Sequence, residues 1–128
     1  MIAGIGLDLC NIERMKQAIG RPRFIQRIYT AAEAERIVAA SEVRRAEIAA
    51  GLFAAKEAVS KALGTGLAGI GTDEIEITPD DAGRPRCVLH GKALDRASAL
   101  CGEGFTVWVS ITHESGMAAA TAVIESQI

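Results

Sequence analysis

The sequence predicts an α+β fold, in which a small, mostly antiparallel sheet packs against helices that include one long helix. Alternating apolar residues near the amino terminus and again after Gly71 are typical of strands, whereas residues 42–63 have the apolar periodicity of a helix. The chain has 128 residues and is 49% hydrophobic, which suffices for one core of ordinary size. Residues 1–128 are therefore expected to form one domain.

The amino-terminal third is expected to hold one strand and three helical segments. Residues 1–8 form the strand, which alternates Ile and Leu with small residues and presents Asp8 at its carboxyl end. Asn11 is expected to cap a helix over residues 12–19, which Gly20 closes. A short helical turn over residues 24–28 follows, and a capping box of Thr30 and Glu33 begins a helix that ends near residue 40.

The remaining elements are the long helix, four strands and one further helix. Ser41 is expected to cap the helix over residues 42–63, and Gly64 to end it. Residues 75–77 and 87–89 are predicted to be strands on either side of a turn at 80–83. Residues 91–99 form a helix, and strands over 106–111 and 117–124 flank a turn at 112–116.

Composition excludes several classes of protein. No stretch approaches the roughly 20 apolar residues of a membrane span. Residues 1–9 lack the basic start of a secretory signal, so a cytoplasmic protein without a membrane anchor is expected. Cys10, Cys87 and Cys101 are odd in number and lack the spacing of a zinc site, so they are expected to be free, buried residues.

A local excess of positive charge lies between residues 9 and 30. The chain as a whole has a net charge of −2. This segment carries five basic residues against the single Glu13, a net charge of +4, and these are Arg14, Lys16, Arg21, Arg23 and Arg27. With 4% aromatic residues and an acidic balance elsewhere, nucleic-acid binding is not expected. The segment favours an acidic protein or a phosphorylated small molecule as partner, the alternative being a solvated helix face.

The long helix is predicted to have an apolar arc and a polar arc. On a helical wheel, the polar arc holds Lys56, Glu57, Ser60 and Lys61, with Phe53 in its middle. A large aromatic ring among charges predicts a contact surface for a ligand or another chain. Packing of Phe53 under a neighbouring loop is the alternative.

Asp8 and Glu57 are candidate ligands of Mg²⁺. Two carboxylates from separate elements can hold this ion together with water and phosphate oxygens, and Lys61 supplies a positive charge for phosphate. The alternative is a surface ion pair between Glu57 and Lys61, which are four residues apart. The glycine-rich residues 64–66 are expected to end the helix rather than bind phosphate, because they lie at its negative end.

His113 is the candidate histidine. It is predicted to lie in the polar turn at 112–116, flanked by Thr112 and Glu114. A histidine in this position can donate a hydrogen bond to phosphate, and simple exposure is the alternative.

Several motifs together resemble the holo-acyl-carrier-protein synthase family. These are GIGLD at residues 4–8 with IER at 12–14, FAAKEAVSKALGTG at 53–66, SITHE at 110–114, and the minor turn motif GRP at 83–85. The likeness covers nearly the whole chain and implies a 4′-phosphopantetheinyl transferase-like fold.

This resemblance implies an activity and an assembly. Members of the family transfer 4′-phosphopantetheine from coenzyme A to a serine of apo-acyl carrier protein, releasing adenosine 3′,5′-bisphosphate, in fatty acid biosynthesis. The resemblance implies a Mg²⁺-dependent homotrimer with sites between neighbouring subunits. Each site would then take its metal-side residues and His113 from different chains.

The resemblance also assigns roles to residues. Asp8 and Glu57 would hold Mg²⁺, and with Lys61 they would form the catalytic group. The expected coenzyme A contacts are Arg44, Ser60, Lys61, Gly64, Thr112 and His113. The expected carrier-protein contacts are Arg14, Arg21, Arg23, Arg27 and Phe53.

Some features remain open at the level of sequence. Leu52 stands where the family often has Arg, and Met117 where it often has Tyr. Either Glu57 or a metal-bound water could remove the serine proton. Two other functions are alternatives: a Mg²⁺-dependent hydrolase of nucleotide pyrophosphates, and a non-catalytic trimeric module that binds an acidic protein.

Overall fold

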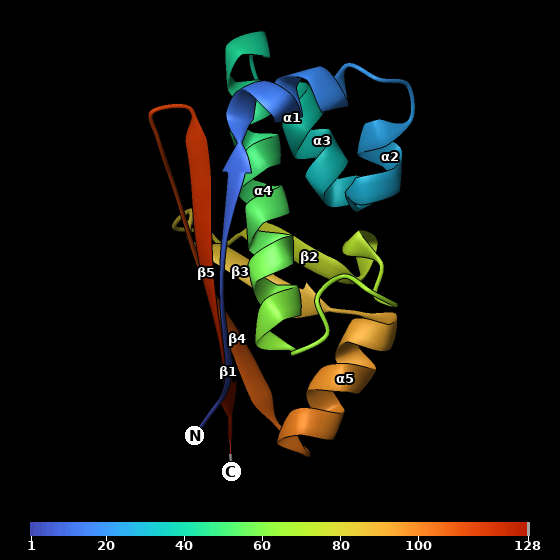
Figure 1. Ribbon diagram of the computed structural model, residues 1–128, viewed down its shortest axis with the longest axis vertical. Helices are drawn as coiled ribbons and strands as arrows, with labels where there is room; N and C mark the ends of the chain where they lie inside the picture. Colours follow the sequence, from blue (N-terminus) through green and yellow to red (C-terminus); the bar gives the residue numbers. More distant parts are fainter. Residues whose placement is uncertain (128) are drawn as a thin grey trace.

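The computed structural model, which describes residues 1–127, is an α+β structure with two antiparallel sheets (Figure 1). The first sheet has three strands in the order β1-β5-β4, namely β1 (Ile2–Asn11), β5 (Met117–Ser126) and β4 (Phe105–Glu114). The second pairs β2 (Ile75–Pro79) with β3 (Pro85–Leu89). The predicted fold class is confirmed, with the strands divided between two sheets.

The helices surround a central one. They are α1 (Ile12–Ile19), α2 (Phe24–Ile28), α3 (Ala31–Ala39), α4 (Glu42–Ala62) and α5 (Gly91–Cys101), and a 3₁₀ turn, η1, spans Thr72–Glu74. Helix α4 packs against all three strands of the first sheet. Figure 1 shows α4 between that sheet and the other elements, with α1 to α3 toward one end and α5 toward the other. No helix of the described residues is long and apolar enough to cross a membrane.

Most of the predicted local signals are confirmed. Asn11 Oδ1 accepts a hydrogen bond from the Arg14 amide at 2.9 Å and caps α1. Thr30 and Glu33 form the reciprocal capping box of α3. Gly64 follows α4 with φ of +82°, a conformation that glycine adopts without strain. Ser41 occupies the N-cap of α4, but its side chain makes no capping hydrogen bond.

All five strands are longer than predicted, and in two of them this moves a candidate residue. Strand β1 continues to Asn11, so Asp8 lies inside the strand and not at its end. Strand β4 continues through residues 112–114, so His113 belongs to a strand and not to a turn. The hairpin turn is only Ser115 and Gly116, with φ of 53° and 80°. Because a two-residue turn of this kind matches strand twist, pairing extends to the end of the hairpin.

The predicted polar arc of α4 is wrong for two of its residues. Lys56 and Ser60 are both 0% exposed. The sheet covers one side of α4, while β2 and α3 also pack against it, so the helix has little free surface at its centre. Phe53 and Glu57 are half-buried, and of the four polar residues only Lys61 is exposed.

Helix α4 approaches β1 at backbone distance because β1 has glycine at two facing positions. A Cβ built on Gly4 would lie 1.9 Å from the Ala62 carbonyl oxygen, and one built on Gly6 would lie 1.8 Å from that of Ala58. Since side chains alternate along a strand, Asp8 lies on the same face as these glycines. The GIGLD motif therefore brings the helix close and places a carboxylate beside it.

The other face of the first sheet is open. Ile5, Leu7 and Leu9 alternate with the helix-facing residues of β1 and are 70%, 61% and 62% exposed. Across the sheet, Trp108 is 48% exposed. Contiguous apolar surface of this kind marks an interaction site.

Candidate functional site

Asp8, Glu57 and Lys61 form a charged cluster on one flank of α4. The Lys61 Nζ donates to Asp8 Oδ1 at 2.9 Å and to the Leu7 carbonyl at 3.0 Å. This contact replaces the alternative predicted from spacing, because Lys61 pairs with Asp8 and not with Glu57. The cluster is half-open: the side chains of Lys61 and Asp8 are 50% and 18% exposed.

The electrostatics of the cluster favour a cation. Burial raises the pKa of Glu57, and the negative charge of Asp8 raises it further, against the opposing effect of Lys61. The hydrogen bond to Asp8 raises the pKa of Lys61. Two carboxylates thus share one ammonium group and together carry an excess negative charge.

These two carboxylates suit Mg²⁺. No group of three or more His, Cys, Asp or Glu able to hold a metal occurs among residues 1–127. Mg²⁺ is commonly held by one or two protein carboxylates, with water and phosphate oxygens as the other ligands. Asp8 and Glu57 provide hard oxygen donors from a strand and a helix, so the donor set fits this ion.

At the end of α4 next to this cluster, the polar groups of Ser60 form hydrogen bonds within the helix and its C-terminal turn. The Ser60 hydroxyl is buried and donates to the Glu57 carbonyl at 2.7 Å. The amides of Thr65 and Gly66 both donate to the Ser60 carbonyl. Gly64 is exposed and follows the helix directly. Of the two coenzyme A contacts predicted here, Gly64 is therefore accessible and the Ser60 side chain is not.

His113 belongs to a second cluster, on the other flank of α4. Its Nδ1 lies 3.2 Å from Glu47 Oε2, which α4 contributes. Arg44 lies one turn before Glu47 on the same helix and is exposed. Thr112 precedes His113 in β4 and so points to the opposite, open face of the sheet, where it too is exposed.

One chain therefore does not bring all the predicted site residues together. Asp8 is on β1 and His113 is on β4, which are opposite edges of the three-stranded sheet. The edge strands are about 10 Å apart, and the glutamates of the two clusters, Glu47 and Glu57, are separated by about 15 Å along α4. A single phosphate cannot contact both clusters of the same chain.

The basic segment forms an exposed surface beside Phe53. Arg14, Arg21 and Phe53 line one cavity of about 380 Å³. Arg23 lines a neighbouring cavity together with Arg21, and Arg27 lies on α2. All four arginines are exposed, and none forms an ion pair with a residue that the structure describes. The ring of Phe53 is half-buried, so it lines this cavity while also packing against the core.

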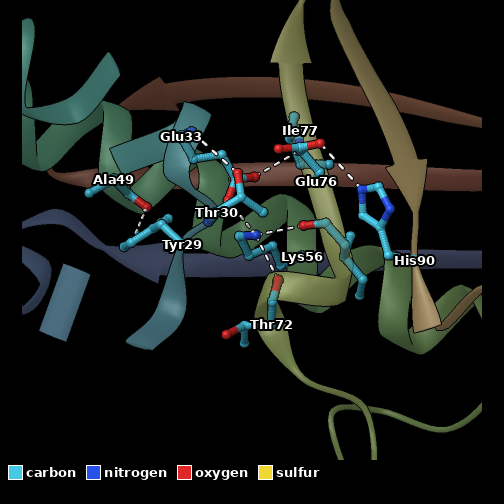
Figure 2. Close-up of polar contacts among 10 residues, drawn as sticks. Tyr29, Thr30, Glu33, Ala49, Lys56, Thr72, Glu76, Ile77 and His90 are labelled. Atoms are coloured by element: carbon cyan, nitrogen blue, oxygen red, sulfur yellow. Dashed lines mark hydrogen bonds and ion pairs between the residues drawn. The ribbon is translucent and has the colours of Figure 1, made fainter. Parts of the chain in front are cut away.

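Sequence reasoning missed a buried ion pair close to the site. Lys56 Nζ lies 2.7 Å from Glu33 Oε1, and both side chains are 0% exposed. Figure 2 shows Lys56 also donating to the carbonyls of Thr72 and Ile75, while Glu33 accepts from the Ile77 amide. Nothing in the helical pattern distinguishes Lys56 from an exposed lysine. Glu47 was missed for the same reason, since its partner lies on a distant strand.

Leu52, where the family often has Arg, is 1% exposed. In this chain the position belongs to the hydrophobic core. A basic contact from this position is therefore absent, and leucine fills the space.

Comparison with known proteins places this architecture in one family. Residues 4–119 match the model of the 4′-phosphopantetheinyl transferase superfamily. A holo-[acyl-carrier-protein] synthase of Solidesulfovibrio magneticus is 47% identical over 129 residues, covering 98% of this chain and 99% of that protein. The enzyme of the same name from Clostridium acetobutylicum is 45% identical and covers 98% of each chain.

Solved structures agree. A holo-(acyl-carrier-protein) synthase from Bacillus anthracis, in complex with CoA (3′,5′-ADP), has a TM-score of 0.82 at 34% identity and covers 99% of each chain. The synthase from Helicobacter pylori in complex with coenzyme A has a TM-score of 0.79 at 26% identity, covering 94% of this chain and 99% of that one.

Proposed function

This chain belongs to the 4′-phosphopantetheinyl transferase superfamily, and we propose that its two clusters together transfer 4′-phosphopantetheine from coenzyme A to a serine of apo-acyl carrier protein. It is a phosphopantetheinyl transferase, as its curated relatives are, with coenzyme A and acyl carrier protein as substrates. The observation that carries the proposal is the meeting of Asp8, Glu57 and Lys61 beside α4. Fatty acid biosynthesis in the cytoplasm is the setting that this activity implies.

In this proposal Asp8 and Glu57 hold Mg²⁺, and Lys61 binds the pyrophosphate of coenzyme A. The bound ion supplies positive charge for the phosphate oxygens. Lys61 has a flexible, exposed ammonium group that can leave Asp8 and follow the negative charge that develops on the leaving adenosine 3′,5′-bisphosphate. Gly64 lies three residues after Lys61 and is exposed, so the substrate can reach it.

The serine hydroxyl of the carrier attacks the phosphorus on the pantetheine side, and the bond to the leaving phosphate breaks. Either Glu57 or a water of the site would accept the serine proton. Positioning and charge stabilisation account for most of the rate in such transfers.

A homotrimer with sites between subunits is part of the proposal. Asp8 and His113 lie on opposite flanks of α4, so a second chain must supply the missing flank of each site. The open face with Ile5, Leu7 and Leu9 offers the apolar surface that such an assembly would bury. Arg44 and His113 then belong to the coenzyme A phosphate side of the site, whereas Thr112 lies on the open face.

The carrier protein is proposed to dock on the surface of Arg14, Arg21, Arg23, Arg27 and Phe53. Unpaired arginines attract an acidic helix over long range and speed its association. The cavity between Arg14 and Phe53 can receive an apolar side chain from the partner.

The test is to incubate the protein with coenzyme A, apo-acyl carrier protein and Mg²⁺, and to measure the mass of the carrier. The expected result is a carrier that gains phosphopantetheine, with loss of activity in Asp8→Ala and Glu57→Ala. Breakdown of coenzyme A without carrier would instead support the hydrolase. Binding of the carrier without modification, unaffected by Asp8→Ala, would support the non-catalytic module.

The docking surface has its own test. Arg14→Glu is expected to raise the KM for the carrier and to weaken its salt dependence, while the KM for coenzyme A stays unchanged. An equal rise in both KM values would contradict the assignment.

A further inference from the structure

Glu47 and His113 meet because four residues of α4 and two residues of β4 advance by a similar distance where the helix packs on the strand. A Cβ built on Gly51 would lie 3.0 Å from Ile111 Cγ2, so helix and strand are in contact there. Four residues toward the start of α4 is a step of about 6 Å, and two residues along β4 is a step of about 6.8 Å. These equal steps lead from Gly51 to Glu47 and from Ile111 to His113, whose Oε2 and Nδ1 lie 3.2 Å apart.

The contact determines which ring nitrogen is available. A carboxylate has no proton to donate, so its 3.2 Å contact with His113 is favourable when Nδ1 carries a proton, as it does in the imidazolium and in the Nδ1–H tautomer. Nε2 has no protein partner among the described residues. It is therefore the nitrogen left for a ligand, and the contact of Nδ1 with Glu47 favours one orientation of the ring.

We propose that Glu47 is a positioning residue, which orients the His113 imidazole so that Nε2 contacts a phosphate of coenzyme A. This inference rests on the proposed function, which places His113 at the phosphates. Glu47 touches no reacting atom itself. Its effect on the enzyme passes through His113.

The negative charge of Glu47 would by itself have the opposite effect on coenzyme A binding. An acidic side chain near a phosphate site repels the ligand, so a Glu47 without a positioning role should weaken coenzyme A binding. Removing it would then lower the KM. A positioning role predicts the opposite change, because a misoriented imidazole loses its bond to the ligand.

The protein contains a matched control pair. His90 Nε2 lies 3.3 Å from Glu76 Oε1, with side chains 50% and 24% exposed, against 51% and 29% for His113 and Glu47. Figure 2 shows the His90 ring facing Glu76, which lies on β2. The control pair has the same chemistry and exposure, and it bonds through the other ring nitrogen.

The experiment is a double-mutant cycle on the full-length enzyme, with the KM for coenzyme A as readout. Glu47→Ala is expected to raise this KM about tenfold and to cause no further rise in a His113→Ala background. Glu47→Gln keeps an oxygen acceptor in place and is expected to retain most of the wild-type activity. Glu76→Gln is expected to leave the KM unchanged.

Nitrogen-15 NMR of the two histidines gives a readout independent of activity. His113 is expected to show the Nδ1–H tautomer when neutral, and Glu47→Ala to shift it toward Nε2–H. Glu76→Gln should change only the signals of His90.

The KM values distinguish a failure of the role of Glu47 from a failure of the role of His113. An unchanged KM in His113→Ala would refute the role of His113 itself, and the inference with it. A raised KM in His113→Ala with an unchanged or lowered KM in Glu47→Ala would overturn only the inference. Additive losses, or equal losses in Glu47→Gln and Glu47→Ala, would also overturn it.

Discussion

At the scale of single residues, the two lysines of the FAAKEAVSK segment lie in opposite environments. Lys56 is buried against Glu33, with its ammonium group 5.8 Å from the centre of the Tyr29 ring. Burial lowers the pKa of Lys56, and the Glu33 carboxylate opposes this effect. Lys61 is exposed and bonds Asp8. The same residue type therefore supports the core at one position and belongs to the proposed site at the other.

Exchanging each lysine for methionine should separate these roles. Lys56→Met leaves Glu33 buried without its cation, and is expected to lower the free energy of unfolding by about 3 kcal/mol. Lys61→Met is expected to change stability little but to abolish phosphopantetheine transfer. Urea denaturation and the carrier-mass assay measure the two effects. A stable Lys56→Met protein would show that the buried pair contributes less than its geometry indicates.

At the scale of elements, the packing of β1 on α4 depends on glycine. The Cβ of Gly6→Ala would overlap the Ala58 carbonyl, which is backbone and cannot turn away. We expect this substitution to lower the free energy of unfolding by about 3 kcal/mol, and to reduce activity because Asp8 moves away from Glu57. Thermal unfolding and the transfer assay measure both.

Gly20→Ala is the control for this prediction. Gly20 has a helical φ of −76°, and its nearest atom to a new Cβ is 3.4 Å away. The free energy of unfolding of Gly20→Ala should stay the same or rise, because alanine has less conformational freedom than glycine in the unfolded chain. Similar losses at both positions would contradict the close-packing argument.

The junction of η1 and α5 should respond to acid. Hydrogen bonds from the backbone amides of Gly71, at 2.6 Å, and Lys92 hold the pKa of Glu74 below its ordinary 4.5. A carboxyl with a lowered pKa stabilises the fold when ionised. This contribution is complete above the unfolded value and is lost as the pH falls through the lowered one.

Glu74→Gln is therefore expected to be less stable than the wild type at neutral pH, by about 1 kcal/mol. The difference should shrink as the pH falls below 4.5. Asp73→Asn, at an exposed neighbour, should show a smaller difference with little pH dependence. Urea denaturation across the acid range measures this, and a gap for Glu74→Gln that persists in strong acid would contradict it.

At the scale of the whole molecule, the proposed trimer would complete each site with residues from two chains. Glu57→Ala removes the metal side of a site, and His113→Ala removes the phosphate side. If each site takes its two sides from different chains, both sides are intact in about a quarter of the sites of trimers mixed from equal amounts of these inactive variants. We expect activity to return when the two are unfolded together and refolded.

Ile5→Glu supplies the structural counterpart of this prediction. Its new charge lies on the open face of the sheet, three residues from Asp8, and should give a folded monomer without transfer activity. Sedimentation measures its mass and circular dichroism its fold. No recovery in the mixed refolding, or a fully active Ile5→Glu monomer, would contradict sites between subunits.

The sequence by itself determined the features that depend on neighbours along the chain. The caps at Asn11 and Thr30, the end of α4 at Gly64 and the α+β class all follow from short-range hydrogen bonding and apolar periodicity. The motifs around Asp8, Glu57 and Lys61 also predicted that these side chains act together, and the structure brings them into one cluster.

Only the tertiary structure decided which side chains meet. It buried Lys56 with Glu33, paired Lys61 with Asp8 in place of Glu57, and joined His113 to Glu47. Each of these contacts links residues far apart in the chain. A helical wheel describes one element, whereas burial and pairing depend on what covers that element from every side.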